Sequence, residues 1–355
     1  MNAPRVTIIT PTYNHEKFIS QCIKSVLDQS FQDWELFIID GGSTDLTIQK
    51  ASEFKDKRIT ILAPGRIGIY QLKRAYNIGL SQSRGQLVTH LEGDDYWPQD
   101  RLLQQVHAFE DRSVILCYGL LETVNSDGIT IRKASSAMLP VSYKVRSNDP
   151  PGEALIELLY RNFIPWPTVM IAKDALLRVG GYQQPFYFPA VDYPTLLSLS
   201  LLGKFRFVDR VFAYYRRHPQ QATVMLSDHS TGSERISLEF LAKLKLSNSK
   251  ALSLLGDISE SRIKIAWRRQ QEWYKFVRGL RLLVSQNWTD SSKIFNELIR
   301  SKYLGMRLQF LAALGRLLSE IRLSPTPAFE LLRRLGYSEV LEIYDTPQGK
   351  SKRIA

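Results

Sequence analysis

The first part of the chain alternates short apolar runs, rich in β-branched residues, with longer stretches in which apolar residues recur every three or four positions. Runs of the first kind predict buried strands, and amphipathic stretches predict helices. Strands are expected at residues 5–10, 34–40, 58–62 and 86–91, and helices at 15–29, from 43–45 to 54, and at 69–83. Because strand and helix alternate at a spacing of about 25 residues, the pattern predicts right-handed βαβ units. Such units form a mostly parallel sheet that is flanked by helices, which is an α/β fold.

The next part of the chain also mixes strands and helices, but with longer breaks. A helix is expected at residues 98–110, a strand at 113–121 and a hairpin at 122–133 with its turn at Asp127-Gly128. Residues 134–153 contain three prolines and are expected to form a loop. Further strands are expected at 169–173, 205–208 and 211–215, and a helix at 195–202.

The last third consists of Leu-rich helical stretches separated by short polar breaks. These predict helices at 237–245, 261–285, 290–301, 306–322 and 328–336. We therefore expect an α/β domain at residues 1–225, with halves at about 1–112 and 113–225, followed by a helical region at 226–355.

The positive charge of the chain is concentrated in this helical region. Of its 355 residues, 44% are hydrophobic and 23% are charged, which is typical of a globular protein, and the formal net charge is +12. Residues 226–355 carry 22 Lys and Arg against 13 Asp and Glu, whereas residues 1–225 carry 25 against 22. Basic helices of this kind pack on the protein, pair with another subunit or lie on an anionic membrane, and all three remain open. Nucleic acid is not expected, because no recognised nucleic-acid-binding module is present.

Two cysteines, Cys22 and Cys117, lie in apolar segments without a metal-ligand spacing. They are expected to be buried free thiols in a reducing compartment. No signal core is expected, because polar residues interrupt the N-terminal apolar pattern at 14–17. No membrane span is expected either, because no apolar run reaches about 18 residues.

Candidate chemistry begins at Leu91-Glu92-Gly93-Asp94-Asp95, where a predicted strand ends on three carboxylates within four residues. Such close like charges repel each other unless a cation lies among them. A divalent cation that takes oxygen ligands, with a diphosphate as a further ligand, meets that need. The alternative is an acidic turn at the start of the next helix, around Trp97-Pro98.

Polar residues also follow two other predicted strands, as Pro11-Thr12-Tyr13-Asn14 and as Asp40-Gly41-Gly42-Ser43. Ligands of parallel α/β sheets bind at the carboxyl ends of strands, so these segments are expected to form one site with the acidic stretch. The chain has neither a Walker-type loop nor a Gly-x-Gly-x-x-Gly segment. A metal is therefore a more suitable partner for phosphates here than a glycine-rich loop.

Four segments together resemble family 2 glycosyltransferases with the A-type nucleotide-diphospho-sugar fold. They are 6–14 (Val-Thr-Ile-Ile-Thr-Pro-Thr-Tyr-Asn), 38–45 (Ile-Ile-Asp-Gly-Gly-Ser-Thr-Asp), 68–85 and Glu92-Gly-Asp-Asp95. Each segment is weak by itself, but their order and spacing are specific. The resemblance covers roughly residues 5–225 and implies an A-type glycosyltransferase domain, Rossmann-like, at 1–225.

The resemblance implies a nucleotide site. Thr10, Pro11 and Tyr13 would line the base pocket, and Asp40 would accept a hydrogen bond from the base. The alternative for Asp40 is to cap the turn that follows it. Asn77 would lie close to the nucleotide or sugar, although a helical Asn can also be a solvated surface residue.

The resemblance also implies a metal site for Mn²⁺ or Mg²⁺. Asp94 and Asp95 would bind the metal together with the ribose and diphosphate of the donor. Glu92 stands where the family usually has aspartate, which keeps a carboxylate but lengthens its reach, and it would help Asp94 to bind the metal. His218, in Arg216-Arg217-His218-Pro219, would bind the metal or, with Arg217, stabilise the departing diphosphate.

The catalytic base is expected at Asp192. Similar transferases usually carry a Glu-Asp pair there, and this chain has Val191-Asp192. Inversion needs one carboxylate that takes the proton of the acceptor hydroxyl as its oxygen attacks the anomeric carbon. The alternative is an N-cap of the predicted helix at Thr195. Trp166 and Tyr182 would pack against sugar faces or belong to the core.

Together these features predict a metal-assisted inverting glycosyltransferase. Its donor would be a nucleotide-diphospho-sugar, expected to be a UDP-sugar, and its acceptor a surface saccharide or lipid-linked precursor at the cytoplasmic face of the membrane. One rival is a nucleotidyltransferase, which would require a glycine-rich phosphate loop that residues 11–17 do not form. The other is a non-catalytic nucleotide-sugar-binding protein of the same fold, suggested by Glu92 and Val191.

Overall fold

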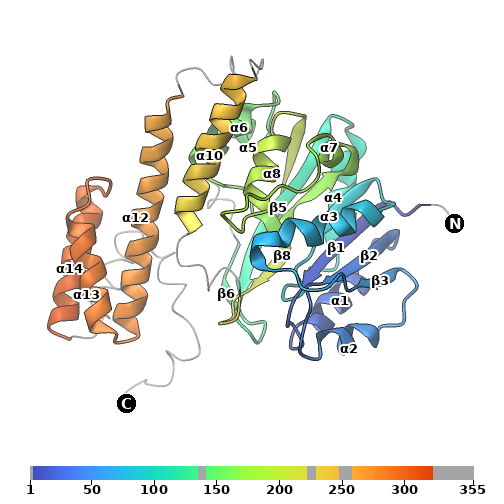
Figure 1. Ribbon diagram of the computed structural model, residues 1–355, viewed down its shortest axis with the longest axis horizontal. Coiled ribbons are helices and arrows are strands. Elements are labelled where there is room, and N and C mark those ends of the chain that lie inside the picture. The colour runs from blue at the N-terminus through green and yellow to red at the C-terminus, as the bar shows by residue number, and fades with distance from the viewer. Residues whose placement is uncertain (1–2, 135–140, 222–228, 248–257, 323–355) are drawn as a thin grey trace. The chain divides into compact units, whose positions relative to one another are not determined.

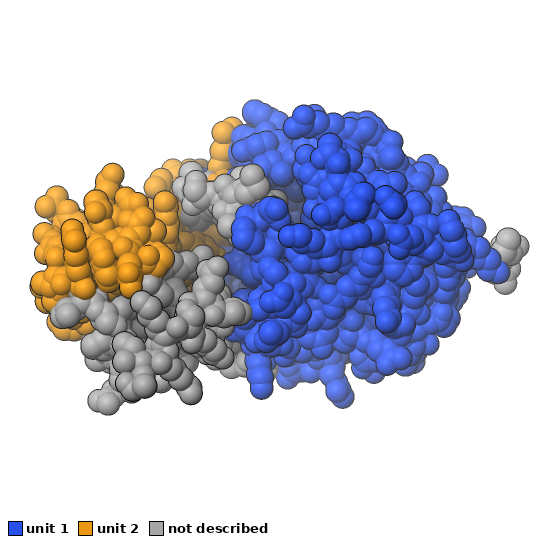
Figure 2. Space-filling model, turned by 90° about the horizontal axis from the view of Figure 1, so that it is seen from below, with its two compact units in different colours: residues 1–225, 236–258 blue, residues 226–235, 259–355 orange. Residues whose placement is uncertain are grey.

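The computed structural model of the chain describes residues 3–134, 141–221, 229–247 and 258–322 (Figure 1). Two compact units are present (Figure 2), one made of residues 1–225 with 236–258 and the other of residues 226–235 with 259–355. The helix α10 (His229–Leu246) contributes residues to both units. The predicted domain boundary at 225/226 stays a prediction.

The first unit is built on one mixed sheet. Its first strands are β1 (Val6–Thr12), β2 (Trp34–Asp40), β3 (Ile59–Leu62) and β4 (Leu87–His90), and the pairings among these four strands are all parallel. The intervening helices are α1 (Ile19–Leu27), α2 (Thr47–Ser52) and α3 (Leu72–Gln82), with a 3₁₀ turn, η1 (Ile69–Gln71), before α3. Every residue of β1 and β2 is buried, because layers of structure cover both faces of the sheet. The predicted mostly parallel sheet flanked by helices is confirmed (Figure 1).

The later strands extend this sheet with mixed orientation. They are β5 (Val114–Val124), β6 (Thr130–Arg132), β7 (Met170–Ala172) and β8 (Lys204–Arg216). The strand order is β3-β2-β1-β4-β7-β5-β6, and β8 pairs in parallel with β5. The short strand β7 is antiparallel to both β4 and β5 and lies between them. The predicted hairpin is present as β5 and β6, with Gly128 at a φ of 81° in its turn.

Helices and short turns connect these strands. They are α4 (Arg101–His107), η2 (Ala108–Glu110), α5 (Tyr143–Ser147), α6 (Glu153–Tyr160), η4 (Trp166–Thr168), α7 (Lys173–Arg178) and α8 (Asp192–Leu199). The expected loop at 134–153 is wrong where the structure describes it, because α5 and the start of α6 lie there. Ser142 caps α5 by accepting a hydrogen bond from Val145 N, and Asn148 ends it with a left-handed backbone.

The core of the first unit joins α1 to the inner strands, and both free cysteines are buried in it. Burial raises the pKa of the Cys117 thiol to about 12. The expectation of buried free thiols is therefore confirmed.

The second unit has its own core, formed between α12 (Glu260–Val284), α13 (Trp288–Ile299) and α14 (Met306–Glu320). Phe295 is fully buried there, and a Cβ atom on Gly315 would lie 2.6 Å from its ring, so this glycine permits close helix packing. Four of the predicted C-terminal helices are thus present, and the fifth, at 328–336, lies outside the described residues. No helix among the residues described here is long and apolar enough to span a membrane.

Candidate active site

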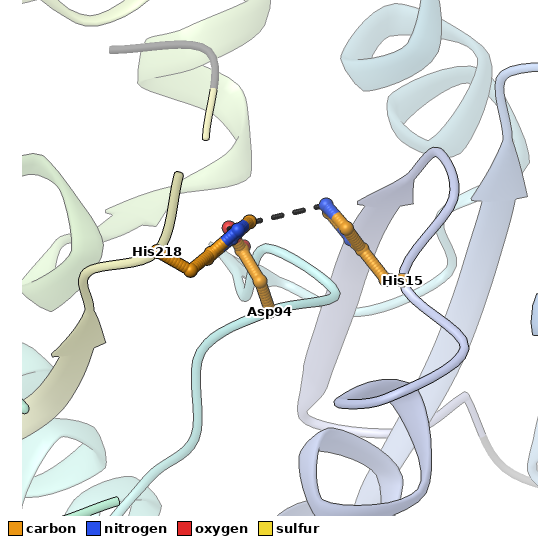
Figure 3. A group of neighbouring side chains, drawn as sticks. All are labelled: His15, Asp94 and His218. Atoms are coloured by element: carbon orange, nitrogen blue, oxygen red, sulfur yellow. Dashed lines mark hydrogen bonds and ion pairs between the residues drawn. The ribbon is translucent and has the colours of Figure 1, made fainter. Parts of the chain in front are cut away.

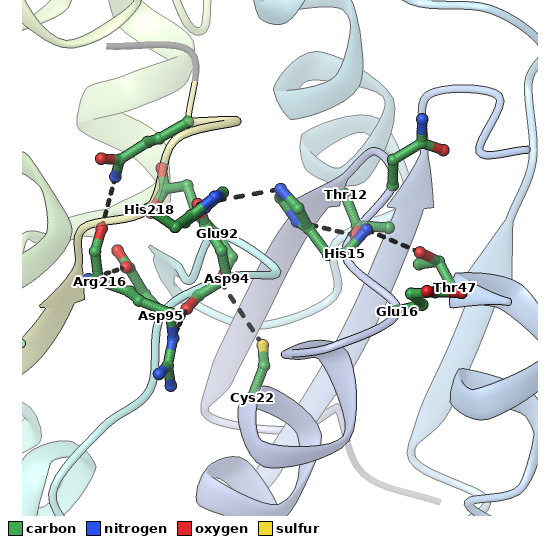
Figure 4. Close-up of polar contacts among 12 residues, drawn as sticks. Thr12, His15, Glu16, Cys22, Thr47, Glu92, Asp94, Asp95, Arg216 and His218 are labelled. Carbon is green, nitrogen blue, oxygen red and sulfur yellow. Dashed lines mark hydrogen bonds and ion pairs between the residues drawn. The ribbon is translucent and has the colours of Figure 1, made fainter. Parts of the chain in front are cut away.

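The acidic stretch after β4 continues alongside the end of β1. Leu91 N donates to Ile9 O, and Gly93 N donates to Pro11 O at 3.1 Å. A Cβ atom at Gly93 would lie 2.5 Å from Thr12 Oγ1 and 2.8 Å from His15 Nδ1, so only glycine fits. This close approach brings Asp94 to the loop that follows β1 (Figure 4).

Three potential metal ligands meet at this point (Figure 3). His218 Nε2 lies 3.0 Å from Asp94 Oδ2, and His15 Nε2 lies 3.9 Å from the same oxygen. One potential ligand atom from each of the three residues lies within 4.8 Å of those of the other two. The residues come from the loop after β1, the loop after β4 and the segment after β8. The structure therefore brings together Asp94 and His218, as predicted, and adds His15.

The electrostatics of this cluster favour the protonation states that metal ligands require. Burial alone raises the pKa of Asp94, but His15 and the hydrogen bond with His218 outweigh it and hold this pKa below its ordinary value. Burial lowers the pKa of His15, and the nearby Asp94 opposes this only in part. An ionised carboxylate beside a neutral imidazole is suited to binding a cation. In addition, His218 Nδ1 is buried and has no hydrogen-bond partner.

Asp95 does not join this cluster. Its Oδ1 accepts a hydrogen bond from the backbone N–H of Arg216 at 2.8 Å. Burial, with Asp94 and Glu92 nearby, raises the pKa of Asp95 well above its ordinary value. Asp95 therefore holds the end of β8 beside the acidic loop, and its metal role stays a prediction.

Arg216 is the buried arginine of the Arg-Arg pair. Its guanidinium donates to three backbone oxygens, those of Asp94, Asn125 and Ser126, and to the side chain of Gln21. It thus ties α1, the acidic loop and the β5–β6 turn to the end of β8. Sequence reasoning assigned no role to this residue.

Arg217 is only partly buried. Its guanidinium lies 5.7 Å from the ring centroid of Tyr215, and its backbone N–H donates to Val124 O. Its role at the diphosphate stays a prediction.

Glu92 points away from the histidines. Its Oε1 accepts a hydrogen bond from the hydroxyl of Tyr76, which belongs to α3. Burial raises the pKa of Glu92 to about 6. Glu92 is absent from the group of potential ligands around Asp94. Its longer side chain anchors the acidic loop to α3, and its metal role stays a prediction.

An aromatic cluster surrounds this anchor. The Trp166 ring stacks on His90 at 4.3 Å between centroids, and the rings of Tyr76 and Tyr182 lie 4.9 Å apart. All four side chains are buried. Trp166 and Tyr182 therefore belong to the core in this structure, which was the alternative to sugar packing.

Tyr76→Phe is expected to lower the free energy of unfolding by about 1–3 kcal/mol, because the buried Glu92 carboxyl loses its partner. Urea unfolding followed by circular dichroism measures the change. Tyr70→Phe is the matched control, since Tyr70 is half-exposed in η1 and has no such bond among the contacts described. Equal stability of the two variants would show that the bond between Tyr76 and Glu92 contributes nothing.

A hollow of about 490 Å³ opens beside the His15, Asp94 and His218 cluster. It is lined by residues 13–18 together with Asp45, His218, Pro219 and Gln220. Of the residues predicted to bind nucleotide, Tyr13 lines this hollow and is 45% exposed, whereas Thr10 and Pro11 are buried.

The other two predicted nucleotide residues make intramolecular hydrogen bonds. Asp40 accepts from the backbone N–H groups of Gly42 and Ser43 and from the Ser43 hydroxyl, as its capping alternative requires. The Asn77 side chain donates to Tyr182 O and accepts from Tyr182 N, both at 2.9 Å, so it braces that segment and is not a solvated surface residue. Nucleotide contacts by Asp40 and Asn77 stay predictions.

Asp192 lies apart from the metal-ligand group. It is the first residue of α8, which starts three residues before Thr195, and Val191 takes the N-cap position, so Asp192 is not the N-cap that was its alternative role. Its Oδ2 accepts a hydrogen bond from Asn162 Nδ2 at 2.9 Å. Asn162 Oδ1 in turn accepts from Ile164 N, which fixes the orientation of the amide. The Asp192 carboxylate is therefore oriented by the segment after α6.

His15 was missed because the amphipathic pattern assigned it to the first turn of a helix. The structure starts α1 only at Ile19 and leaves His15 in a loop. Asn14 takes a φ of 54°, and His15 Nδ1 lies 3.2 Å from Thr12 Oγ1. The available signal was the position of His15 directly after the polar strand end at 11–14.

Known proteins are similar to this chain in sequence. Residues 7–174 match the family described as Glycosyl transferase family 2. An uncharacterized glycosyltransferase of Haemophilus influenzae is 34% identical over 207 residues, which cover 57% of this chain and 76% of that protein. The Escherichia coli UDP-Glc:alpha-D-GlcNAc-diphosphoundecaprenol beta-1,3-glucosyltransferase WfgD is 36% identical over 128 residues, covering 35% of this chain and 48% of WfgD.

The fold is similar to that of a solved transferase. The crystal structure of S. aureus TarS 1-349 in complex with UDP-GlcNAc has a TM-score of 0.55 and 15% sequence identity, covering 94% of this chain and 92% of that one. At this identity the likeness concerns the fold alone. The sequence match, the similar fold and the site at the strand ends agree: the chain belongs to glycosyl transferase family 2 and is a glycosyltransferase with the A-type fold.

Proposed function

We propose that this glycosyltransferase moves a sugar from a UDP-sugar to a saccharide or lipid-linked saccharide with inversion, in surface polysaccharide biosynthesis. The observation that carries the proposal is the group formed by His15, Asp94 and His218 beside the hollow. Two imidazole nitrogens and a carboxylate oxygen suit a divalent cation with positions left for a diphosphate. The choice of donor is supported by the name of WfgD, which includes UDP-Glc, and by the TarS structure, which is a complex with UDP-GlcNAc.

The residues of this group fit Mn²⁺ or Mg²⁺. Two imidazoles favour Mn²⁺, because Mg²⁺ is bound mainly through oxygen. When bound, the ion neutralises the charge of the diphosphate leaving group. Asp94 and the two histidines hold it, with Asp95 and Glu92 supporting their loop, and Arg217 contributes positive charge on the side of β8.

Asp192 is proposed as the base. Its carboxylate removes the proton of the acceptor hydroxyl while that oxygen bonds to the anomeric carbon and the bond to the diphosphate breaks. Asn162 holds one carboxylate oxygen in a fixed orientation, which positions the base.

The nucleotide is proposed to occupy the hollow and the adjoining strand ends. Tyr13 offers an exposed ring there, and Thr10 and Pro11 lie buried in the preceding strand β1. Asp40 would accept from the imide N–H of uracil while it keeps its turn, because a carboxylate has about four acceptor positions. Asn77 would act near the sugar through the segment it braces.

The acceptor is proposed to be lipid-linked and used at the cytoplasmic face of the membrane, where the enzyme would be peripheral. The name of WfgD includes a diphosphoundecaprenol-linked sugar, which supports this class of acceptor.

Calorimetric titration of UDP, GDP and dTDP, each with and without Mn²⁺, tests the donor and the metal. We expect UDP to bind more tightly than the other two, and only in the presence of Mn²⁺. No binding of any nucleotide would overturn the proposal. Binding that ignores Mn²⁺ would favour the non-catalytic nucleotide-sugar-binding alternative.

A further inference from the structure

The helix α14 exposes large apolar side chains along one line. Met306 is 87% exposed, Phe310 66%, Leu317 51% and Ile321, at the C-cap, 51%. Ala313 is exposed between them. Since successive helical residues lie about 100° apart, these five positions fall within an arc of about 80°. We call residues 306, 310, 313, 317 and 321 the α14 stripe.

The opposite side of α14 is also apolar and already has its partner. Its buried residues are Leu311, Ala312, Gly315, Leu318 and Ser319, which face the core shared with α12 and α13. A helix with an apolar core face needs no second apolar face for folding. Contiguous exposed apolar residues usually mark an interaction site. The core between α12, α13 and α14 therefore does not require the α14 stripe, which is available to contact a partner.

The chemistry around the stripe is basic. Arg307 is exposed on one flank, and Arg316 lies on the other, where it pairs with Glu320 at 2.7 Å and with Asn296. Across residues 259–322 there are 13 Lys and Arg against 5 Asp and Glu. A line of apolar side chains between arginines, on a strongly basic unit, is typical of helices that lie on anionic membranes.

We propose that the α14 stripe docks the enzyme on an anionic phospholipid membrane. The stripe enters the boundary between headgroups and acyl chains, and the flanking arginines meet lipid phosphates. The inference rests on the proposed function only in that a lipid-linked acceptor gives this docking its purpose. A second copy is the less suitable occupant, because it would bring two strongly basic units together, whereas an anionic surface complements their charge.

The test is co-sedimentation of the full chain with vesicles of phosphatidylcholine containing about 30% phosphatidylglycerol, and with neutral vesicles. We expect binding to the anionic vesicles only, weakened by salt at about 0.5 M. The double variant Phe310→Ser/Leu317→Ser is expected to bind at least about tenfold more weakly. Its matched control is Phe186→Ser/Leu177→Ser, which removes a more exposed Phe and a Leu of similar exposure from the first unit.

Three results would overturn the proposal. The wild-type chain could fail to sediment with anionic vesicles, both double variants could lose binding equally, or ultracentrifugation could show a dimer that only the α14 variant disrupts. The calorimetric binding of UDP is expected to be unchanged in the α14 variant. Failure of membrane docking is thereby distinguished from failure of the nucleotide site.

Discussion

Asp94→Asn is expected to lower the rate of sugar transfer by at least about a thousandfold, because the one carboxylate among the proposed ligands disappears. His15 and His218 would remain as two imidazole ligands, too few to hold a divalent ion beside a diphosphate. The release of UDP from a UDP-sugar measures the rate. Electron paramagnetic resonance of free Mn²⁺ measures the loss of metal affinity independently of activity.

Asp100→Asn is the matched control for this change, because Asp100 is an exposed aspartate at the N-cap of α4. It is expected to leave both the rate and Mn²⁺ binding unchanged. If Asp94→Asn keeps full Mn²⁺ affinity while remaining folded, the group around His218 is a purely structural network and the proposed metal site is wrong.

Asp192→Asn is expected to lower kcat by about 10²–10⁴ through loss of the general base, with donor binding unaffected. The substitution keeps the size of the side chain and an oxygen that can accept from Asn162. Calorimetry with UDP and Mn²⁺ measures donor binding, and single-turnover transfer measures the chemical step.

Asp174→Asn, an exposed aspartate in the first turn of α7, controls for a change at a helix start. If Asp192→Asn reduces the stability of the protein but not the transfer rate, the role of Asp192 is only to stabilise α8, and the proposed base is wrong. Partial recovery of kcat by Asp192→Glu would support a carboxylate that acts on the proton.

The inner sheet could be predicted because its signal is local. Strands β1, β2 and β4 are apolar runs that end on polar residues, and the order of such units determines a parallel arrangement. The orientation of β7 could not be predicted, because its partners in β4 and β5 are distant in sequence. The helix α5 was missed because the prolines near it indicated a loop.

Within the site, residue types were easier to predict than partners. Asp94 was found because charges cluster at the end of a predicted strand, whereas His218 was indicated by the resemblance of residues 216–219 to the family. The contact of Asn77 with Tyr182 spans 105 residues, and no local pattern records it. Likewise, the pattern did not say which of two adjacent arginines is buried, since that depends on the loops around Arg216.

The three residues of β7 have a consequence for how the first unit can be divided. Met170 pairs with Thr89 on one side and with Cys117 on the other. The two halves predicted at 1–112 and 113–225 therefore share one continuous ladder. A cut between them would leave the side of β4 open, and β4 is a fully buried strand whose exposed backbone would invite pairing with other chains. The two halves are thus expected to unfold as a single cooperative unit, and neither could be exchanged between relatives without the residues of β4, β5 and β7 that pair across this cut.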